Sequence, residues 1–462
     1  MSGTSSADSR TDRDSIGEID LPADALYGPQ TQRAVTNFPL RGQRRLGDFP
    51  LFVDALVAVK GAAATANGAQ GHLDRDISEA IIAAGDAVRS GAHYDEFPIH
   101  HLHGGGGTSA NMNANEVLAN LASSALGGER GAWHPVHPLR HVNLHQSTND
   151  VVPTASRIAA SWAWDACAQD VEGLEEAIAH AIQRFGGIPR LARTCLQDAA
   201  AMTFGDLLGG YLSLVKRFRR RIDHAVTESL EVSLGGALVG RAADVPSGYQ
   251  VMVVAALSST TGIDGLRRTP DLPDGAQNPD ALLEVASALD VAARSLLKIA
   301  KDLRLLASGP EFGFCEIRLE AVQPGSSALP AKVNPVIPEH VVQLAMKISA
   351  LREMASAALE HGELDLNVWE MPMTAAVLEQ FELLGSAAAA LARCVGGASP
   401  DEGRNREHAG ATLALLYEVS GREGYEAADN LAVENLGDLG LIRAEILRRH
   451  PDLAPPDAKL RD

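Results

Sequence analysis

The sequence predicts a mainly α-helical chain of three domains, with a bundle of long helices at its centre. Aromatic residues make up only 4% of its 462 residues and the middle of the chain is rich in alanine, which suits close packing of long helices. Segments with the alternating pattern of strands are sparse. From Pro153 onward, apolar residues recur at the spacing of one helical stripe, at Ile158, Trp162, Cys167, Val171, Leu174 and Ile178.

The first predicted domain, residues 1–145, alternates turn-rich pieces with helices. One helix start is well marked, because four glycines from Gly104 to Gly107 precede Thr108, a residue suited to capping. This start is expected to present free backbone N–H groups.

The second predicted domain, residues 146–399, contains the long helices. Pro153 suits the first turn of the first of them. Further helices are predicted over 281–306, 341–359 and 373–394. After residue 400 the composition becomes more charged, which predicts a small helical domain over 400–462.

The overall charge excludes some classes of partner. A net charge of -19 and a pI near 5.2 argue against nucleic acid, and the basic run 216–221 has the spacing of a solvated helix face. No uninterrupted apolar run is long enough for a membrane span or a signal peptide, so we expect a cytoplasmic protein without a membrane partner. The four scattered cysteines are expected to be reduced thiols.

Four polar clusters fall on predicted loops or helix starts. The richest is the stretch 325–339, whose three prolines and leading glycine exclude a regular helix or central strand. The others are Thr108-Ser109, the run 146–150 and the run 194–198. Each offers small hydroxyl or amide groups that suit carboxylate oxygens, although each taken alone also fits a helix cap or a turn.

These four clusters, in this order and over nearly the whole chain, resemble the aspartase/fumarase superfamily of homotetrameric lyases. The stretch 325–339 keeps that family's two adjacent serines, lysine and asparagine in register, as Ser326, Ser327, Lys332 and Asn334, but has Leu329 where a methionine is usual. The segments 13–34 and 302–306 are also similar to the family.

The resemblance implies an elimination that forms fumarate through an aci-carboxylate intermediate, in a homotetramer whose core contains 20 helices. Ser326 would be the catalytic base, and Lys332 would bind the second carboxylate with Asn334 and Thr194. Glu339 would be an acidic partner of the site, and Asn149 would hold the leaving amine. The remaining carboxylate donors would be Thr108, Ser109, Ser147, Thr148 and Ser327. Each active site would draw residues from three subunits.

The leaving group is predicted to be ammonia, from L-aspartate, because the segments 146–150, 334–339 and 366–370 resemble aspartases more than fumarases. Cys195 occupies a position where fumarases have histidine and some aspartases have glutamine, and its role stays open. His100, His103 and Glu311 also depart from the family pattern. Three alternatives therefore remain: an aspartase-like lyase for a modified or N-substituted aspartate, a fumarate hydratase, and a non-catalytic structural protein.

No cofactor and no metal ligand set are expected. Histidines are dense between His93 and His145, but their spacing is irregular and the implied chemistry needs no metal. Ala307-Ser308-Gly309 matches the tripeptide from which aromatic ammonia-lyases build an electrophile, but that electrophile is needed when the proton removed is not beside a carboxylate.

Overall fold

A computed structural model describes residues 9–241, 243 and 245–454; the outer ends of the two predicted terminal domains, 1–8 and 455–462, lie outside this range. The described chain is mainly α-helical, which confirms the predicted fold class. It divides into two compact units: the first comprises 1–167, 220–291 and 347–384, and the second comprises 168–219, 292–346 and 385–462. The three-domain boundaries stay a prediction.

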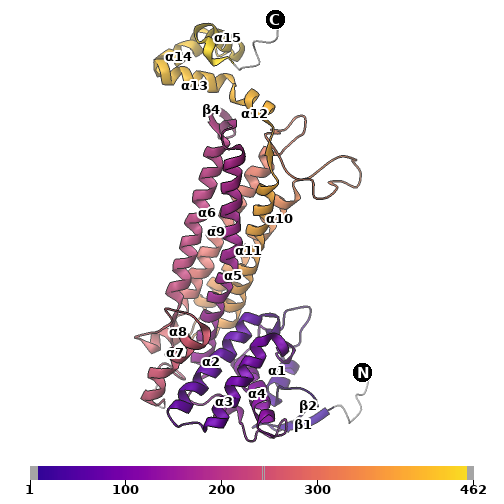
Figure 1. Cartoon of the computed structure of the whole chain (residues 1–462), viewed down its shortest axis with the longest axis vertical. Coiled ribbons are helices and arrows are strands. Elements are labelled where there is room, and N and C mark those ends of the chain that lie inside the picture. Colours follow the sequence, from indigo (N-terminus) through magenta and orange to yellow (C-terminus); the bar gives the residue numbers. More distant parts are fainter. Residues whose placement is uncertain (1–8, 242, 244, 455–462) are drawn as a thin grey trace. The chain divides into compact units, whose positions relative to one another are not determined.

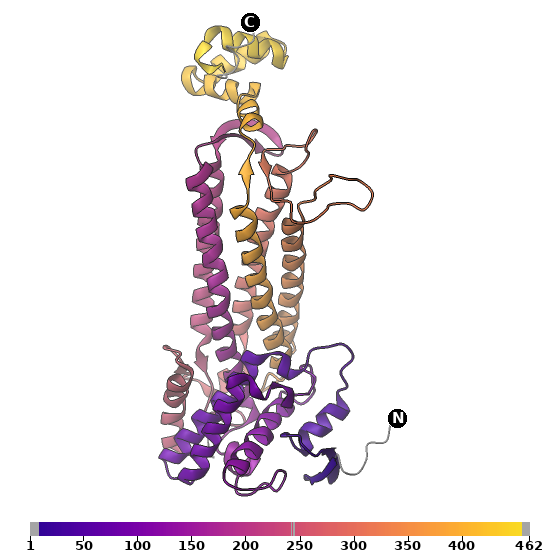
Figure 2. The same ribbon diagram turned by 45° about the vertical axis from the view of Figure 1, so that its right-hand side comes forward.

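Five long helices each contribute residues to both units, and within each unit their segments pack side by side (Figures 1 and 2). They are α5 (Thr148–Phe185), α6 (Phe204–Ser229), α9 (Asp280–Leu306), α10 (Val336–Glu360) and α11 (Glu370–Gly396). The predicted helices are present, but α5 begins before Pro153. The caps supplied by residues 147 and 150 start the helix five residues earlier, so the proline lies inside it and leaves one intrahelical bond unmade.

In the first unit, α2 packs against α3, α4 and α7, and α3 also packs against α4. The four packed helices are α2 (Pro50–Ala69), α3 (Arg75–Ala87), α4 (Thr108–Ala125) and α7 (Ser247–Thr261). The shorter elements of this unit are β1 (Ser9–Arg13), β2 (Glu18–Pro22), α1 (Pro29–Asn37), β5 (Glu231–Val232), β6 (Arg267–Arg268) and α8 (Leu272–Gln277). The buried Glu116 of α4 joins two of these pieces: its carboxylate accepts the N–H groups of Gly28, Gln30 and Thr31 at the start of α1.

Buried polar contacts fix the long helices of the first unit against one another. Arg157 of α5 forms an ion pair with Glu370 of α11 at 3.1 Å, and both side chains are more than nine-tenths buried. Ser156 and Thr374 share a hydrogen bond of 2.6 Å between the same helices. The start of α5, where a candidate cluster lies, is therefore held by a well-specified interior.

The second unit contains two strand pairs and a helical carboxyl-terminal segment. Its other elements are β3 (Pro189–Thr194), β4 (Gln197–Thr203), β7 (Ile317–Arg318), β8 (Ser399–Pro400), α12 (Glu402–Ala409), α13 (Thr412–Glu423), α14 (Tyr425–Glu434) and α15 (Leu439–Arg449). The last three helices enclose a small core of Leu415, Val419, Leu431, Ile442 and Ile446. The chain after residue 400 is thus helical over the part that the structure describes, while its standing as a separate domain stays a prediction.

Among the described residues one helix, α11, has the length and composition of a membrane span, with 61% of its most apolar window buried inside the protein. Such burial is typical of a core helix, and Gln380 within it donates to the backbone oxygens of Ala286 and Ile348.

Candidate functional site

Thr108 and Ser109 open α4 after a turn made entirely of glycine. Gly105, Gly106 and Gly107 have φ of +88°, +62° and +86°, a left-handed run that other residues adopt only at a cost. Thr108 is exposed and Ser109 is half-buried. The helix begins where predicted, but its N-cap is Gly107 and the Thr108 side chain makes no capping hydrogen bond. Both hydroxyls lie where the positive end of the helix dipole favours an anion.

Ser147 caps α5, and Asp150 completes the cap. The Ser147 oxygen accepts the N–H of Asn149 at 3.3 Å, while the Asp150 carboxylate accepts the N–H of Ser147 at 2.9 Å. Asp150 is fully buried and also accepts the N–H groups of Gly235 and Ala237. Burial raises the pKa of Asp150 to about 6. This carboxylate anchors the helix start to the loop that follows β5.

The side chains of Thr148 and Asn149 have fixed orientations. Thr148 Oγ1 accepts a hydrogen bond from Asn111 Nδ2 at 3.1 Å. Asn149 Nδ2 donates to the backbone oxygen of Leu238 at 2.7 Å. This bond fixes which side of the amide is the nitrogen, and Asn149 Oδ1 is an acceptor that suits an ammonium group.

Thr194 and Cys195 lie at the turn of the β3–β4 hairpin. Thr194 pairs with Gln197, so the turn consists of Cys195 and Leu196 alone, with φ of +53° and +61°. Positive φ at both central residues is the conformation of a type I′ turn, which usually contains Asn and Gly. Two ordinary side chains in this conformation store strain of about 1–2 kcal/mol each. Both Thr194 and Cys195 are exposed, as a ligand contact requires.

Glu316, a residue that the sequence did not single out, anchors this hairpin. Its side chain is fully buried, and it binds Arg193 of β3 at 2.6 Å and His408 of α12 at 2.9 Å. Its backbone oxygen accepts the Asn405 amide at 2.6 Å, also from α12. Arg190 lies 3.9 Å from the same carboxylate. Glu316 thus holds the strand that ends at Thr194.

Ser326 lies in a loop that closes on itself. The N–H of Gly325 donates to Lys332 O at 2.8 Å, and Asn334 Nδ2 donates to Gly325 O at 2.7 Å. A Cβ on Gly325 would stand 2.4 Å from Lys332 O, so this closure requires glycine. Ser326 Oγ accepts two backbone N–H groups, from Ala328 at 3.1 Å and Leu329 at 3.0 Å. Two amide donors on one hydroxyl oxygen favour its anionic form.

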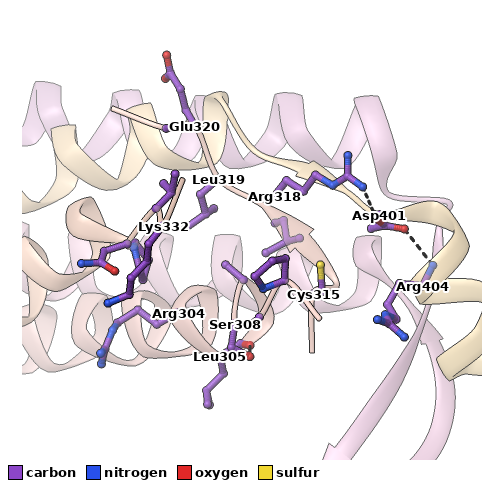
Figure 3. Close-up of a pocket in the computed structure, with 18 of the residues that line it drawn as sticks. Arg304, Leu305, Ser308, Cys315, Arg318, Leu319, Glu320, Lys332, Asp401 and Arg404 are labelled. Atoms are coloured by element: carbon purple, nitrogen blue, oxygen red, sulfur yellow. Dashed lines mark hydrogen bonds and ion pairs between the residues drawn. The ribbon is translucent and has the colours of Figure 1, made fainter. Parts of the chain in front are cut away.

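Lys332, Asn334 and Glu339 line one cavity of about 1120 Å³ in the second unit (Figure 3). Three acid–base pairs also line it: Arg304 with Glu339 at 3.4 Å, Arg318 with Asp401, and Arg404 with Glu407. Within the described part of the chain, no carboxylate pairs with Lys332, which is exposed. Its ammonium group is thus available to an external anion.

The predicted site residues therefore fall into two groups. Thr108, Ser109, Ser147, Thr148 and Asn149 belong to the first unit, and the seven others belong to the second. The cavity includes Lys332, Asn334 and Glu339 but not Ser326, Ser327, Thr194 or Cys195. Ser327 is exposed and Glu339 is 38% exposed in the single chain. The roles of all twelve stay predictions.

Sequence reasoning also missed Lys60, which lies in the apolar run Leu56–Ala66 of α2 and is fully buried. A signal was present, because a single charged residue in a run that should be buried requires a polar partner. Lys60 Nζ donates to Asn143 Oδ1 at 2.8 Å, and burial lowers the pKa of Lys60 to about 7. Hydrogen bonds through Asn143 and Asn111 connect this amine to Thr148, in the first turn of α5.

Comparison with known proteins places the chain among enzymes. Residues 17–350 match a family described as lyase. The chain is 36% identical over 428 residues to an aspartate ammonia-lyase of a Bacillus species, covering 92% of this chain and 91% of that protein. It is also 36% identical to a class II fumarate hydratase of Myxococcus xanthus, with coverage of 92% and 90%. The structure of a fumarate lyase:delta crystallin from Brucella melitensis superposes with a TM-score of 0.87 at 37% identity, covering 95% of this chain and all of that one.

Proposed function

Because the chain belongs to the aspartase/fumarase superfamily of lyases, we propose that it eliminates ammonia from L-aspartate to give fumarate. The proton lost is on the carbon beside a carboxylate, and it is far less acidic than the conjugate acid of any side-chain base. Its removal places two negative charges on that carboxylate. Catalysis thus depends on a base with enhanced basicity and on donors around the developing charge.

The observation that carries this proposal is the pair of amide donors on Ser326. The N–H groups of Ala328 and Leu329 both point at Ser326 Oγ. Donors of this kind stabilise a serine oxyanion and so lower the cost of using serine as a base. In the proposed mechanism the alkoxide of Ser326 takes the proton, and the electron pair of the broken C–H bond moves onto the adjacent carboxylate. The hydroxyls of Thr108, Ser109, Ser147, Thr148 and Ser327 stabilise that aci-carboxylate.

Collapse of the aci-carboxylate forms the carbon–carbon double bond and expels ammonia from the neighbouring carbon. Asn149 Oδ1 is the proposed acceptor for the ammonium group, since the nitrogen of that amide is bound to Leu238 O. Lys332, with Asn334 and Thr194, binds the second carboxylate as a charge-assisted contact. Glu339 remains the proposed acidic partner, balanced in this chain by Arg304.

We further propose that the enzyme is a cytoplasmic homotetramer in which three subunits supply each active site. A separate chain would then have no complete site, so activity should follow the amount of tetramer.

Water is the second candidate leaving group, favoured by the 36% identity to a class II fumarate hydratase. An N-substituted aspartate is the third substrate to test, since Cys195 lies exposed beside Thr194 and differs from the usual residues there. Ultraviolet absorbance of fumarate separates the three. We expect the purified tetramer to release fumarate from aspartate, and release only from malate or only from argininosuccinate would replace the ammonia-lyase proposal.

Ser326→Ala tests the base directly. We expect kcat to fall by about 10²–10⁴, the range for a general base, while succinate still binds. Circular dichroism and the mass of the assembly control for folding. Full turnover by this variant would remove Ser326 from the mechanism.

A further inference from the structure

Five polar side chains form a continuous hydrogen-bond network at the start of α5. Asn143 Oδ1 accepts three hydrogen bonds, from Lys60 Nζ at 2.8 Å and from the Nδ2 atoms of Asn111 and Asn115, each at 3.2 Å. Asn111 Nδ2 also donates to Thr148 Oγ1 at 3.1 Å. Lys60, Asn111 and Asn115 are each at most 2% exposed. The network therefore runs from a buried amine to a hydroxyl of the candidate site.

The orientation of Asn143 is set twice. Its Nδ2 donates to the backbone oxygen of Gln146 at 3.1 Å, so that side of the amide must be the nitrogen. Its other side faces Lys60 Nζ at 2.8 Å, and this amine has an N–H to donate in both its charged and its neutral form. Asn143 Oδ1 is consequently an acceptor toward α4.

This acceptor in turn orients Asn111. A reversed Asn111 amide would place its oxygen 3.2 Å from Asn143 Oδ1, where two lone pairs would repel. The nitrogen of Asn111 therefore faces both Asn143 and Thr148, while its Oδ1 stays buried without a partner among the described residues. A buried oxygen without a hydrogen bond costs about 1–3 kcal/mol, so the orientation of the Asn111 amide is set by its neighbours and not by its own hydrogen bonding.

The orientation of Asn111 determines which hydrogen bonds the Thr148 hydroxyl can still form. Its oxygen already accepts from Asn111, and no described residue accepts its proton. We propose that Lys60, Asn143 and Asn111 form a directional relay that makes the Thr148 hydroxyl a hydrogen-bond donor to a substrate carboxylate. Asn111 is then a positioning residue that never touches the substrate. This inference rests on the proposed function, since it assumes a carboxylate at Thr148.

The chain supplies a matched control for the test. Asn115 lies one helical turn beyond Asn111, donates to the same Asn143 oxygen and has an unpartnered Oδ1 of its own, but does not contact Thr148. Asn111→Leu and Asn115→Leu thus each remove one amide donor from Asn143 Oδ1. Calorimetric titration of the full-length tetramer with succinate, which cannot react, measures carboxylate recognition by itself.

Asn111→Leu is expected to raise the succinate Kd about tenfold, the weight of one hydrogen bond to a charged group, and Asn115→Leu to leave it within about twofold. Thr148→Val should match Asn111→Leu, and the double variant should bind no more weakly than Thr148→Val alone. Asn111→Ala carries the same expectations if the leucine variant does not assemble.

Equal losses in the two leucine variants, additive losses in the double variant, or a wild-type tetramer that does not bind succinate would overturn the relay. The proposed ammonia-lyase activity is judged separately. A wild-type tetramer that binds succinate but releases no fumarate from aspartate removes that activity and leaves the Kd ratios to decide on the relay.

Discussion

Replacing Lys60 with methionine should stabilise the protein and make its stability depend on pH in a different way. Burial lowers the pKa of Lys60 from 10.5 to about 7, and Nζ makes one hydrogen bond, to Asn143, among the described residues. At ~1.4 kcal/mol for each pH unit, keeping this amine charged in the fold costs on the order of 5 kcal/mol. Methionine has a similar length and no charge to desolvate.

The sign of the pH effect follows from proton binding. Between pH 7 and 10.5 the unfolded chain holds a proton on this amine and the folded chain does not, so the free energy of unfolding rises with pH across that window. The cost is therefore complete below pH 7 and falls away toward pH 10.5. From pH 7.5 to 9.5 it decreases by about 2.5 kcal/mol.

At pH 7.5 we expect Lys60→Met to be more stable than the wild type by about 1–3 kcal/mol, after subtracting the lost hydrogen bond to Asn143. At pH 9.5 the difference should be smaller by about 2.5 kcal/mol. Urea unfolding at fixed protein concentration measures both values, and Lys216→Met, on an exposed part of α6, controls for loss of a lysine. Parallel pH profiles for the Lys60 variant and the wild type would refute the reasoning.

Two further predictions concern the hairpin that carries Thr194. Glu316→Gln leaves Arg193 without its buried counter-charge, so we expect the free energy of unfolding in urea to fall by about 3 kcal/mol and KM to rise. The control is Asp198→Asn, which removes an exposed partner 3.9 Å from the same arginine and should change the free energy of unfolding by less than about 1 kcal/mol. Cys195→Gly relieves a side chain at φ +53° and should raise the melting temperature, by an amount equivalent to about 0.5–1 kcal/mol; an unchanged or lower value would contradict strain at this turn.

The sequence predicted four of the five long helices, because apolar residues recur along them at helical spacing, as in α9 and α11. For α6 it indicated only that the basic run 216–221 lies on a helix face. It misplaced the start of α5, since Pro153 is a strong local signal and the cap of Ser147 and Asp150 depends on backbone geometry. The β3–β4 hairpin was not predicted either. Its turn contains Cys195 and Leu196 rather than Asn and Gly, so the conformation is imposed by contacts such as that of Glu316.

The candidate site divides in a similar way. Ser326, Lys332 and Asn334 could be found because their spacing in one short loop is itself the signal. Lys60 acts through Asn143, 83 residues away, and Asn111 acts on Thr148, 37 residues away. Glu316 likewise binds residues of distant elements, and no local pattern records such contacts. Residues that position a reacting group are harder to predict than residues that touch the substrate, because only the fold brings them to their partners.

The hydroxyls of the candidate site also differ in how many donors they accept, and this difference separates their chemistry. Ser147 and Thr148 each accept one N–H, from Asn149 and Asn111, so each keeps its proton and can donate it to a carboxylate. Ser326 accepts two N–H groups, which favour loss of its proton. Three chemically similar hydroxyls can thus act as two donors and one base. Removing a hydrogen-bond donor from Ser326 should weaken proton abstraction and lower kcat. Removing the donor from Thr148 should weaken substrate binding and raise KM.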